Sequence, residues 1–166
     1  MTAIRRLVAG DAAELAALRT ANRAYLEQWD PDWDDPERLY SFRGVRAWIT
    51  DGNHRFAILD GAEIAGMVSL TGIIRGSMQT CMVGYFVDEQ RAGRGLATRA
   101  VRDAVAVAFG ELQLHRVEAG TAVANIASQK VLEHNGFTLV GRMRKHLQIQ
   151  GVWVDHLLWE TLADDD

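Results

Sequence analysis

The sequence predicts a mixed α/β domain with a central sheet of about seven strands and about four helices. Three observations support this fold class. Three successive β-like runs between residues 55 and 87 are separated by turn residues, which indicates an antiparallel meander. A glycine-containing loop at 90–95 then leads into a helical apolar face and a further strand, which is the order of a parallel crossover. A short helix and two final strands complete the sheet.

Composition limits the function classes. The chain has 166 residues, 48% hydrophobic and 24% charged, with a formal net charge of −4, which fits one ordinary domain and argues against an extended nucleic-acid surface. Cys81 is the only cysteine, so no internal disulfide is expected, and no apolar run has the length of a signal peptide or a membrane span. We therefore expect a cytoplasmic protein with one domain at 1–163 and an acidic tail at 164–166, without direct nucleic-acid or membrane binding.

The first half of the chain is expected to form a strand, two helices and two strands of the meander, at 2–8, 11–29, 35–49, 55–59 and 63–74. Asp11 with Glu14 three residues later resembles a capping box, which places a helix start there. Asp35 followed by Pro36 has the form of an N-cap with proline at the first helical position, so the second helix is predicted to begin at this pair.

The second half is expected to form a third meander strand, a helix, a crossover strand, a short helix and two C-terminal strands, at 78–87, 96–108, 115–122, 125–134, 137–148 and 152–161. The crossover order makes the strands at 78–87 and 115–122 parallel neighbours. Asn125 is typical of an N-cap for the short helix, and Asn135-Gly136 is typical of a left-handed cap after it.

The stretch QRAGRGLA at 90–97 suggests a ligand, because two glycines and two arginines directly precede a helix. Glycines remove Cβ atoms from a turn, so that consecutive N–H groups can converge on one anion, and Arg91 and Arg94 add positive charge. The same residues also fit a tight strand-to-helix turn with solvated arginines. The third glycine of a Rossmann fingerprint is replaced by Thr98, and the Gly-Lys-Ser/Thr of a P-loop is absent.

Two segments in this order carry a family resemblance. VGYFVDEQRAGRGLATRAV at 83–101 is similar to the diphosphate loop of the GNAT family of acyl-CoA-dependent N-acetyltransferases, and NIASQKVLEHNGF at 125–137 is similar to the asparagine–serine helix of that family. The branch that the chain resembles is the RimJ/RimL type, which acetylates N-terminal residues of ribosomal proteins, because WDP at 29–31 and GVWVD at 151–155 also fit. The resemblance covers nearly the whole chain.

The resemblance implies a GNAT-like sheet whose central strands, ending at Val87 and starting at His115, splay apart and hold the pantetheine arm of acetyl-CoA as a pseudo-strand. The diphosphate would then lie on the amides of the glycine loop, where the helix dipole favours negative charge. The implied cofactor-binding residues are Phe86, Val87, Asp88, Arg91, Ala92, Gly93, Arg94, Gly95, Leu96, Ala97, Asn125 and Ser128.

Three residues are candidates for the chemistry, which needs a neutral amine, a stabilised oxyanion and a proton for the leaving thiolate. Ser128 resembles the family serine that reaches the coenzyme sulfur, and Asn125 resembles the residue that holds the pantetheine arm. Either could instead act only locally, on the backbone of its own helix. Glu118 is the candidate base, because the resemblance implies a glutamate at a comparable strand position that deprotonates the amine through water. Where RimL-type enzymes can use a carboxylate from the late hairpin, this chain offers Gln148 and Gln150. A structural ion pair of Glu118 with Arg116 or a neighbour is the alternative.

The candidate acceptor site is WDPDWDDPE at 29–37, where five carboxylates surround two tryptophans. In the resembling family this loop borders the acceptor entrance, so Trp29, Asp30, Asp32 and Trp33 are expected to attract cationic amines. A soluble turn with one helix cap fits the same pattern.

The predicted activity is transfer of an acetyl group from acetyl-CoA to a primary amine in a ternary complex, with the N-terminal α-amine of a ribosomal protein or another peptide as the first candidate acceptor. Acetylation of a polyamine or an antibiotic, and a non-catalytic acyl-CoA-binding module, are the alternatives. Exposed strand edges and the resemblance make a homodimer reasonable. No metal is expected, because the five histidines show no close pair at metal-ligand spacing, and His115 and His156 could line a cleft or be satisfied in the sheet.

Overall fold

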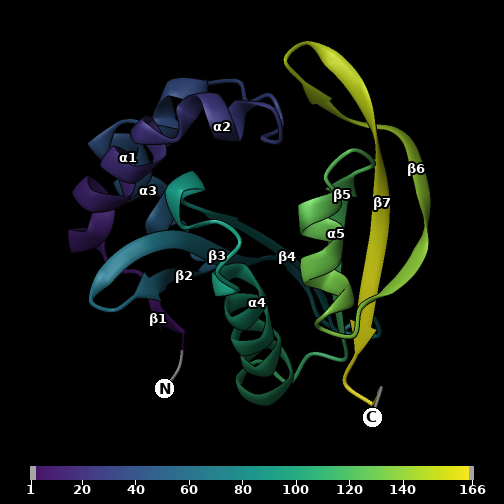
Figure 1. The fold of residues 1–166 in the computed structure, drawn as a ribbon. Coiled ribbons are helices and arrows are strands. Elements are labelled where there is room, and N and C mark those ends of the chain that lie inside the picture. The colour runs from purple at the N-terminus through teal and green to yellow at the C-terminus, as the bar shows by residue number, and fades with distance from the viewer. Residues whose placement is uncertain (1–2, 165–166) are drawn as a thin grey trace.

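The computed structural model describes residues 3–164, which form one seven-stranded mixed sheet with the order β1-β2-β3-β4-β5-β7-β6 (Figure 1). The strands are β1 (Ile4–Arg6), β2 (His54–Asp60), β3 (Glu63–Ile74), β4 (Thr80–Val87), β5 (Arg116–Ala122), β6 (Thr138–Ile149) and β7 (Val152–Leu162). The α-helices are α1 (Ala12–Ala21), α2 (Arg23–Glu27), α3 (Phe42–Ile49), α4 (Leu96–Ala106) and α5 (Ile126–Glu133). Short helical turns are η1 (Ala9–Asp11), η2 (Pro36–Leu39), η3 (Glu89–Arg91) and the π-helical η4 (Val107–Glu111).

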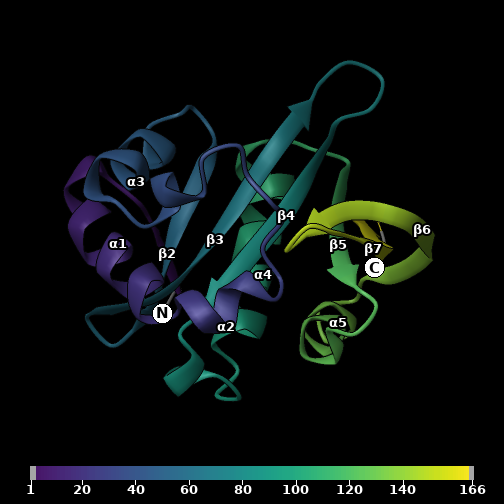
Figure 2. The same ribbon diagram turned by 90° about the horizontal axis from the view of Figure 1, so that it is seen from above.

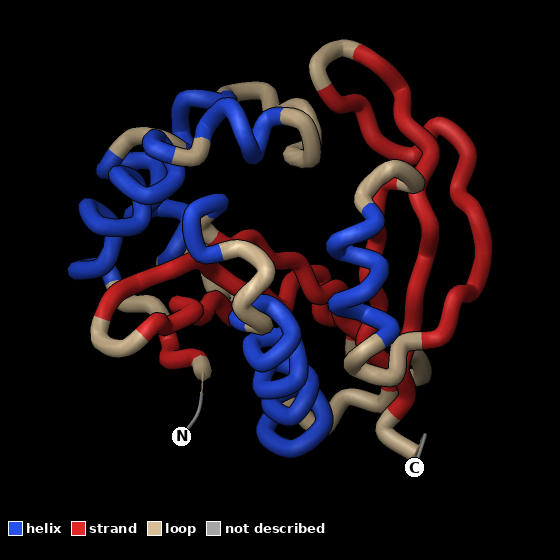
Figure 3. Tube along the Cα trace, in the orientation of Figure 1, coloured by secondary structure: helices blue, strands red, loops and turns tan. Residues whose placement is uncertain are grey.

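Helices cover both faces of the sheet (Figure 2). One core lies under α1 and α3, where Leu15 and Val45 pack with Ala57 of β2. The other lies under α4, where Val101 packs with Val117 of β5. Figure 3 shows α4 and α5 side by side, and it shows the segment after α2 opposite the tip of the β6–β7 hairpin.

The predicted meander and the parallel crossover are both confirmed, since β2, β3 and β4 pair antiparallel and β4 pairs with β5 in parallel. The parallel ladder has three pairs, the last of which is Met82 with Glu118. Beyond it the strands separate, although β4 stays paired with β3 as far as Val87 and β5 stays paired with β7 as far as Ala122. This splay frees one edge of β4, and the candidate site lies there.

The helix predicted over 11–29 is two helices, α1 and α2, which meet at Asn22. The buried Asn22 side chain donates to the Leu18 carbonyl oxygen (2.9 Å) and accepts from the Glu89 amide (2.8 Å). A side chain that bonds backbone groups competes with regular helical bonding, which explains the break. The same side chain anchors the break to the segment that precedes the glycine loop.

The predicted capping box at the start of α1 does not form. The Asp11 carboxylate instead accepts from the Val8 amide (2.8 Å) and from Arg5. Glu14 accepts from the Ile64 amide of β3 (3.0 Å), so it joins the helix to the sheet. Both carboxylates thus serve partners outside the first turn of α1.

The second helix begins later than the predicted Asp35-Pro36 start. That pair opens the short turn η2, and the Asp35 side chain makes no capping bond. Ser41 is the N-cap of α3, because its hydroxyl oxygen accepts from the Gly44 amide (3.1 Å). Phe42, at the first position of α3, is exposed.

The ends of the chain and the helix lengths add two facts. Of the predicted acidic tail, Asp165 and Asp166 lie outside the described residues. Within residues 3–164, no helix is long and apolar enough to cross a bilayer.

Candidate active site

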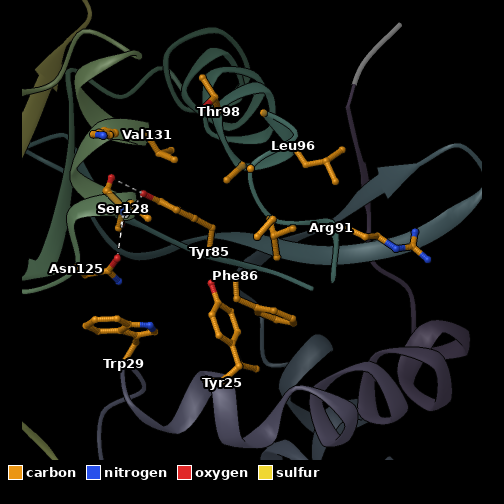
Figure 4. A pocket seen from close by; sticks show the side chains of 18 of the residues that line it. Tyr25, Trp29, Tyr85, Phe86, Arg91, Leu96, Thr98, Asn125, Ser128 and Val131 are labelled. Atoms are coloured by element: carbon orange, nitrogen blue, oxygen red, sulfur yellow. Dashed lines mark hydrogen bonds between the residues drawn. The ribbon is translucent and has the colours of Figure 1, made fainter. Parts of the chain in front are cut away.

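A cavity of about 410 Å³ lies where the glycine loop, the start of α5 and the free edge of β4 meet (Figure 4). It is bounded on a fourth side by α2 and the segment that follows, from which Tyr25 and Trp29 project toward it. The predicted cofactor-binding residues that line it are Phe86, Val87, Arg91, Ala92, Gly93, Gly95, Leu96, Ala97, Asn125 and Ser128. Two predicted residues, Asp88 and Arg94, do not line it.

The glycine loop adopts a conformation that explains its glycines. Gly93 and Gly95 have φ values of 74° and 73°, in the left-handed region, and Gly95 is the N-cap of α4. A Cβ atom on Gly93 would meet no heavy atom within 4 Å, so backbone conformation, not crowding, requires glycine there. The loop therefore presents the first amides of α4 to the cavity, at the positive end of the helix dipole.

The two arginines of the loop have carboxylate partners within the chain. Arg91 bonds Glu63 (2.5 Å) and lies 3.6 Å from Asp60, and Arg94 bonds Asp60 (2.7 Å). Figure 4 shows the Arg91 guanidinium directed away from Ser128, although the residue lines the cavity. Because both guanidinium groups are already paired, the positive charge for an anion bound in this cavity is better supplied by another residue.

That residue is Lys130, which sequence reasoning missed. It lines the cavity, is exposed, and makes no ion pair among the described residues. Four residues line the cavity at positions i, i+3, i+4 and i+7: Ala127, Lys130 and Val131 of α5, and its C-cap His134. This helical spacing, counted from the predicted Asn125 cap, is the sequence signal from which these four residues could have been predicted.

Asn125, Ser128 and Tyr85 form the polar centre of the cavity. The Asn125 side chain accepts from the Ser128 amide (3.1 Å), so it caps α5 and also lines the cavity. The Tyr85 hydroxyl lies 2.8 Å from the Ser128 hydroxyl oxygen and donates to the Ser128 carbonyl oxygen at 3.2 Å (Figure 4). Burial raises the pKa of Tyr85 to about 12, so the phenol keeps its proton.

Tyr85 was also missed from the sequence. It lies on β4 beyond the last pair with β5, where the strand edge is free. Its hydroxyl reaches Ser128 across 43 residues of sequence, and no local pattern reports that contact. The splay of the sheet is what makes the contact possible.

Glu118 lies in a different part of the sheet. It stands opposite Met82 in the last parallel pair, and its carboxylate accepts from Arg116 (2.6 Å). Arg116 also forms an ion pair with Glu160 of β7. Glu118 lines neither the cavity at Ser128 nor the smaller one next to it, and its contacts are those of the structural ion pair.

A second cavity of about 240 Å³ opens between the splayed strands. It shares Tyr85, Asn125 and Ser128 with the first, so the two cavities meet at the hydroxyl pair. Its other walls are formed by Trp29, Asp30 and Pro31 after α2, by Leu147 of β6 and by His156 of β7.

Three of the five carboxylates of the 29–37 segment, those of Asp30, Asp32 and Glu37, have partners inside the protein. Asp30 forms an ion pair with the buried Arg19, and burial raises the pKa of Asp30 against the effect of that charge. Asp32 accepts from the backbone amides of Gln150 (2.7 Å) and Gly151 (2.8 Å). These structural bonds therefore explain in part why several carboxylates stand close together in this segment.

The two tryptophans of this segment lie at different places. Trp29 lines both cavities at the hydroxyl pair. Trp33 is 41% exposed and lines a third cavity of about 410 Å³, with the Arg38 guanidinium 5.8 Å from its ring. Within residues 3–164, no three His, Cys, Asp or Glu side chains are grouped so that they could hold a metal ion.

Residues 2–138 match the family model described as the acetyltransferase (GNAT) domain. The chain is 40% identical over 173 residues to the probable N-acetyltransferase YjcK of Bacillus subtilis, a match that covers 98% of this chain and 94% of that protein.

Solved structures give the same result. The ribosomal-protein-S5-alanine acetyltransferase of Vibrio fischeri matches with a TM-score of 0.88 and 30% identity, over 98% of this chain and 93% of that one. RimJ of Mycobacterium smegmatis, in complex with CoA-disulfide, matches with a TM-score of 0.91 and 28% identity, over 98% and 82%.

Proposed function

The chain belongs to the GNAT acetyltransferase family, and from this premise we propose that it transfers the acetyl group of acetyl-CoA to the N-terminal α-amine of a protein or peptide, with both substrates bound together. The observation that carries the proposal is the Tyr85–Ser128 hydroxyl pair, which lies where two cavities meet. One cavity would hold the acetyl donor, and the other would admit the amine.

The first cavity fits acetyl-CoA as a substrate. Its glycine loop offers backbone amides at a helix N-terminus for the diphosphate, and Lys130 adds an unpaired positive charge. The free edge of β4 offers backbone groups to the amides of a pantetheine arm, in the manner of an added strand. Phe86 and Val87 fit this role, whereas the Asp88 amide already donates to the Ala65 carbonyl (2.8 Å).

Ser128 and Tyr85 fit the proton donor for the leaving thiolate. A phenol with a pKa of about 12 holds its proton, and the 2.8 Å contact lets the Ser128 hydroxyl pass one on while recovering another from Tyr85. Asn125 keeps the start of α5, and hence Ser128, in place. These residues bind and orient the thioester and supply the proton at sulfur.

The second cavity supports an amine acceptor that enters between the segment after α2 and the β6–β7 hairpin. Trp29 and Asp30 are the residues of the predicted acceptor site that line it. Two similar proteins carry names that fit a protein acceptor: the Vibrio fischeri structure is called a ribosomal-protein-S5-alanine acetyltransferase, and the Mycobacterium smegmatis structure is called RimJ. We propose a protein or peptide N-terminus on this ground.

A thiol-release assay tests the proposal. The protein is incubated with acetyl-CoA and a panel of peptides with free N-termini, their N-blocked copies, polyamines and aminoglycosides, and free coenzyme A is measured. Release that depends on a free peptide N-terminus supports the proposal. Release only with the small amines moves the assignment to small-amine acetylation, and tight acetyl-CoA binding without acceptor-dependent release indicates a binding module.

A further inference from the structure

The second cavity contains a histidine to which the scheme above gives no role. His156 lies on β7 opposite Ala122, at the last pair between β5 and β7. The residue is 4% exposed and lines the 240 Å³ cavity together with Tyr85 and Ser128. A buried histidine thus lines the cavity that, under the proposed function, admits the acceptor amine.

The ring of His156 is held so that one nitrogen stays free. Nδ1 lies 3.1 Å from the Val154 carbonyl oxygen, and a carbonyl oxygen only accepts, so Nδ1 carries the hydrogen. The neutral ring then has its lone pair on Nε2, which has no hydrogen-bond partner among the residues described. The His146 ring packs edge-on against the His156 ring, with 5.6 Å between the two ring centroids, and this contact helps to hold the His156 ring in its orientation.

The surroundings of His156 favour the neutral ring. Burial lowers its pKa, and so does the neighbouring His146, while the Val154 carbonyl and Asp155 act in the opposite direction. Asp155 is already bonded to Arg142 and to the Lys145 amide. The other titratable groups that line the cavity are Asp30, which is paired with Arg19, and Tyr85, which keeps its proton.

We infer that Nε2 of His156 accepts the proton that the acceptor amine loses, an assignment that rests on the proposed function. The amine nitrogen bonds to the thioester carbonyl carbon, the C–S bond breaks, and one N–H proton moves to Nε2. The sulfur takes a proton from the Ser128–Tyr85 pair, and the imidazolium returns its proton to that pair through water. His156 shares a cavity with Ser128, and Glu118 does not.

The experiment compares wild type with His156→Gln, which lacks a basic nitrogen, over a range of about pH 5.5 to 9, with acetyl-CoA saturating and an active acceptor peptide from the panel. His115→Gln is the matched control, because His115 is exposed and lies outside both cavities. Glu118→Gln tests the competing carboxylate. A proton-NMR titration of the His156 ring in the ligand-free protein gives a readout independent of activity.

We expect His156→Gln to lower kcat/KM for the acceptor by about 100-fold near neutral pH, with the KM for acetyl-CoA unchanged. The loss should shrink above about pH 8, where the α-amine is neutral without help. The wild-type acidic limb and the NMR titration should share one pKa, below the ordinary histidine value of 6.5. If His156→Gln unfolds, His156→Ala keeps the test open, because added imidazole should restore activity to a folded protein that lacks only the base.

If the wild type is active and its pH profile of kcat/KM is the same in His156→Gln, this inference is overturned and the proposed function is not. The same holds if the acidic limb of the profile moves only in Glu118→Gln. A ring whose pKa in the NMR titration differs from that of the wild-type acidic limb also overturns it. A wild type that acetylates nothing in the panel overturns the proposed function, and this inference with it.

Discussion

Tyr85→Phe removes one oxygen atom from the site and leaves the ring in place. The lost hydroxyl has two contacts, both on Ser128: the hydroxyl oxygen at 2.8 Å and the carbonyl oxygen at 3.2 Å. The fold loses these two neutral hydrogen bonds, each of which contributes about 1 kcal/mol to the free energy of unfolding. Turnover loses the group that reprotonates Ser128, so kcat should fall by about 10- to 1000-fold, or about 1.4–4 kcal/mol in the barrier.

The assay measures acceptor-dependent thiol release by Tyr85→Phe, Ser128→Ala and the double variant, and urea unfolding measures stability in parallel. Two groups that act as one unit are strongly non-additive, so the double variant should be about as slow as Ser128→Ala. Because the pKa of Tyr85 is raised to about 12, kcat should stay level on the alkaline side up to about pH 10. A Tyr85→Phe protein that is less stable but turns over normally would refute the role of the pair.

Three further substitutions test the walls of the site. Gly95→Ala puts a side chain at φ 73° and should weaken acetyl-CoA binding in calorimetry. Gly110→Ala, at an ordinary φ with open space around it, is the control and should leave the affinity unchanged. Equal affinities in the two variants would show that the glycine loop does not bind the cofactor. Lys130→Ala should raise the Kd for acetyl-CoA by about 3- to 10-fold at low salt and by less at high salt, and a salt-independent change would argue against a charge contact. Asp32→Ala should raise the KM for the acceptor peptide but not for acetyl-CoA, because it removes the contact to the β6–β7 hairpin. Asp34→Ala serves as the control, since the Asp34 side chain has no bonded partner among the described residues. Equal acceptor KM values in the two variants would show that the contact to the hairpin has no role in acceptor binding.

Local patterns predicted much of this fold. The meander, the parallel crossover, the Asn125 cap and the left-handed Gly136 depend on residues close in sequence, and the structure has all of them. The glycine loop was predicted for the same reason, because two left-handed residues directly before a helix leave a local signature.

Features that depend on distant partners could not be predicted in this way. Arg91 looked available for an anion, yet Glu63, 28 residues away, bonds it. Asp32 was expected to attract cationic amines, yet it accepts from backbone amides that lie 118 and 119 residues further along the chain. Asn22 broke a helix that its apolar spacing predicted as continuous, because it bonds the Glu89 amide. Each correction comes from a tertiary contact made by a polar side chain.

The bonds of Asp32 have a topological consequence. The carboxylate holds the Gln150 and Gly151 amides, and the Asp32 amide donates to the Gln148 carbonyl (2.7 Å), which closes an arch between the segment after α2 and the β6–β7 turn. The second cavity lies beneath it, with walls from both sides of the arch and from the strands below. A polymer can pass under a closed arch only by one of its ends, unless the arch opens. For an acceptor that enters by this route, as proposed above, threading under the arch would favour a chain terminus over an amine within a folded surface, before any proton moves.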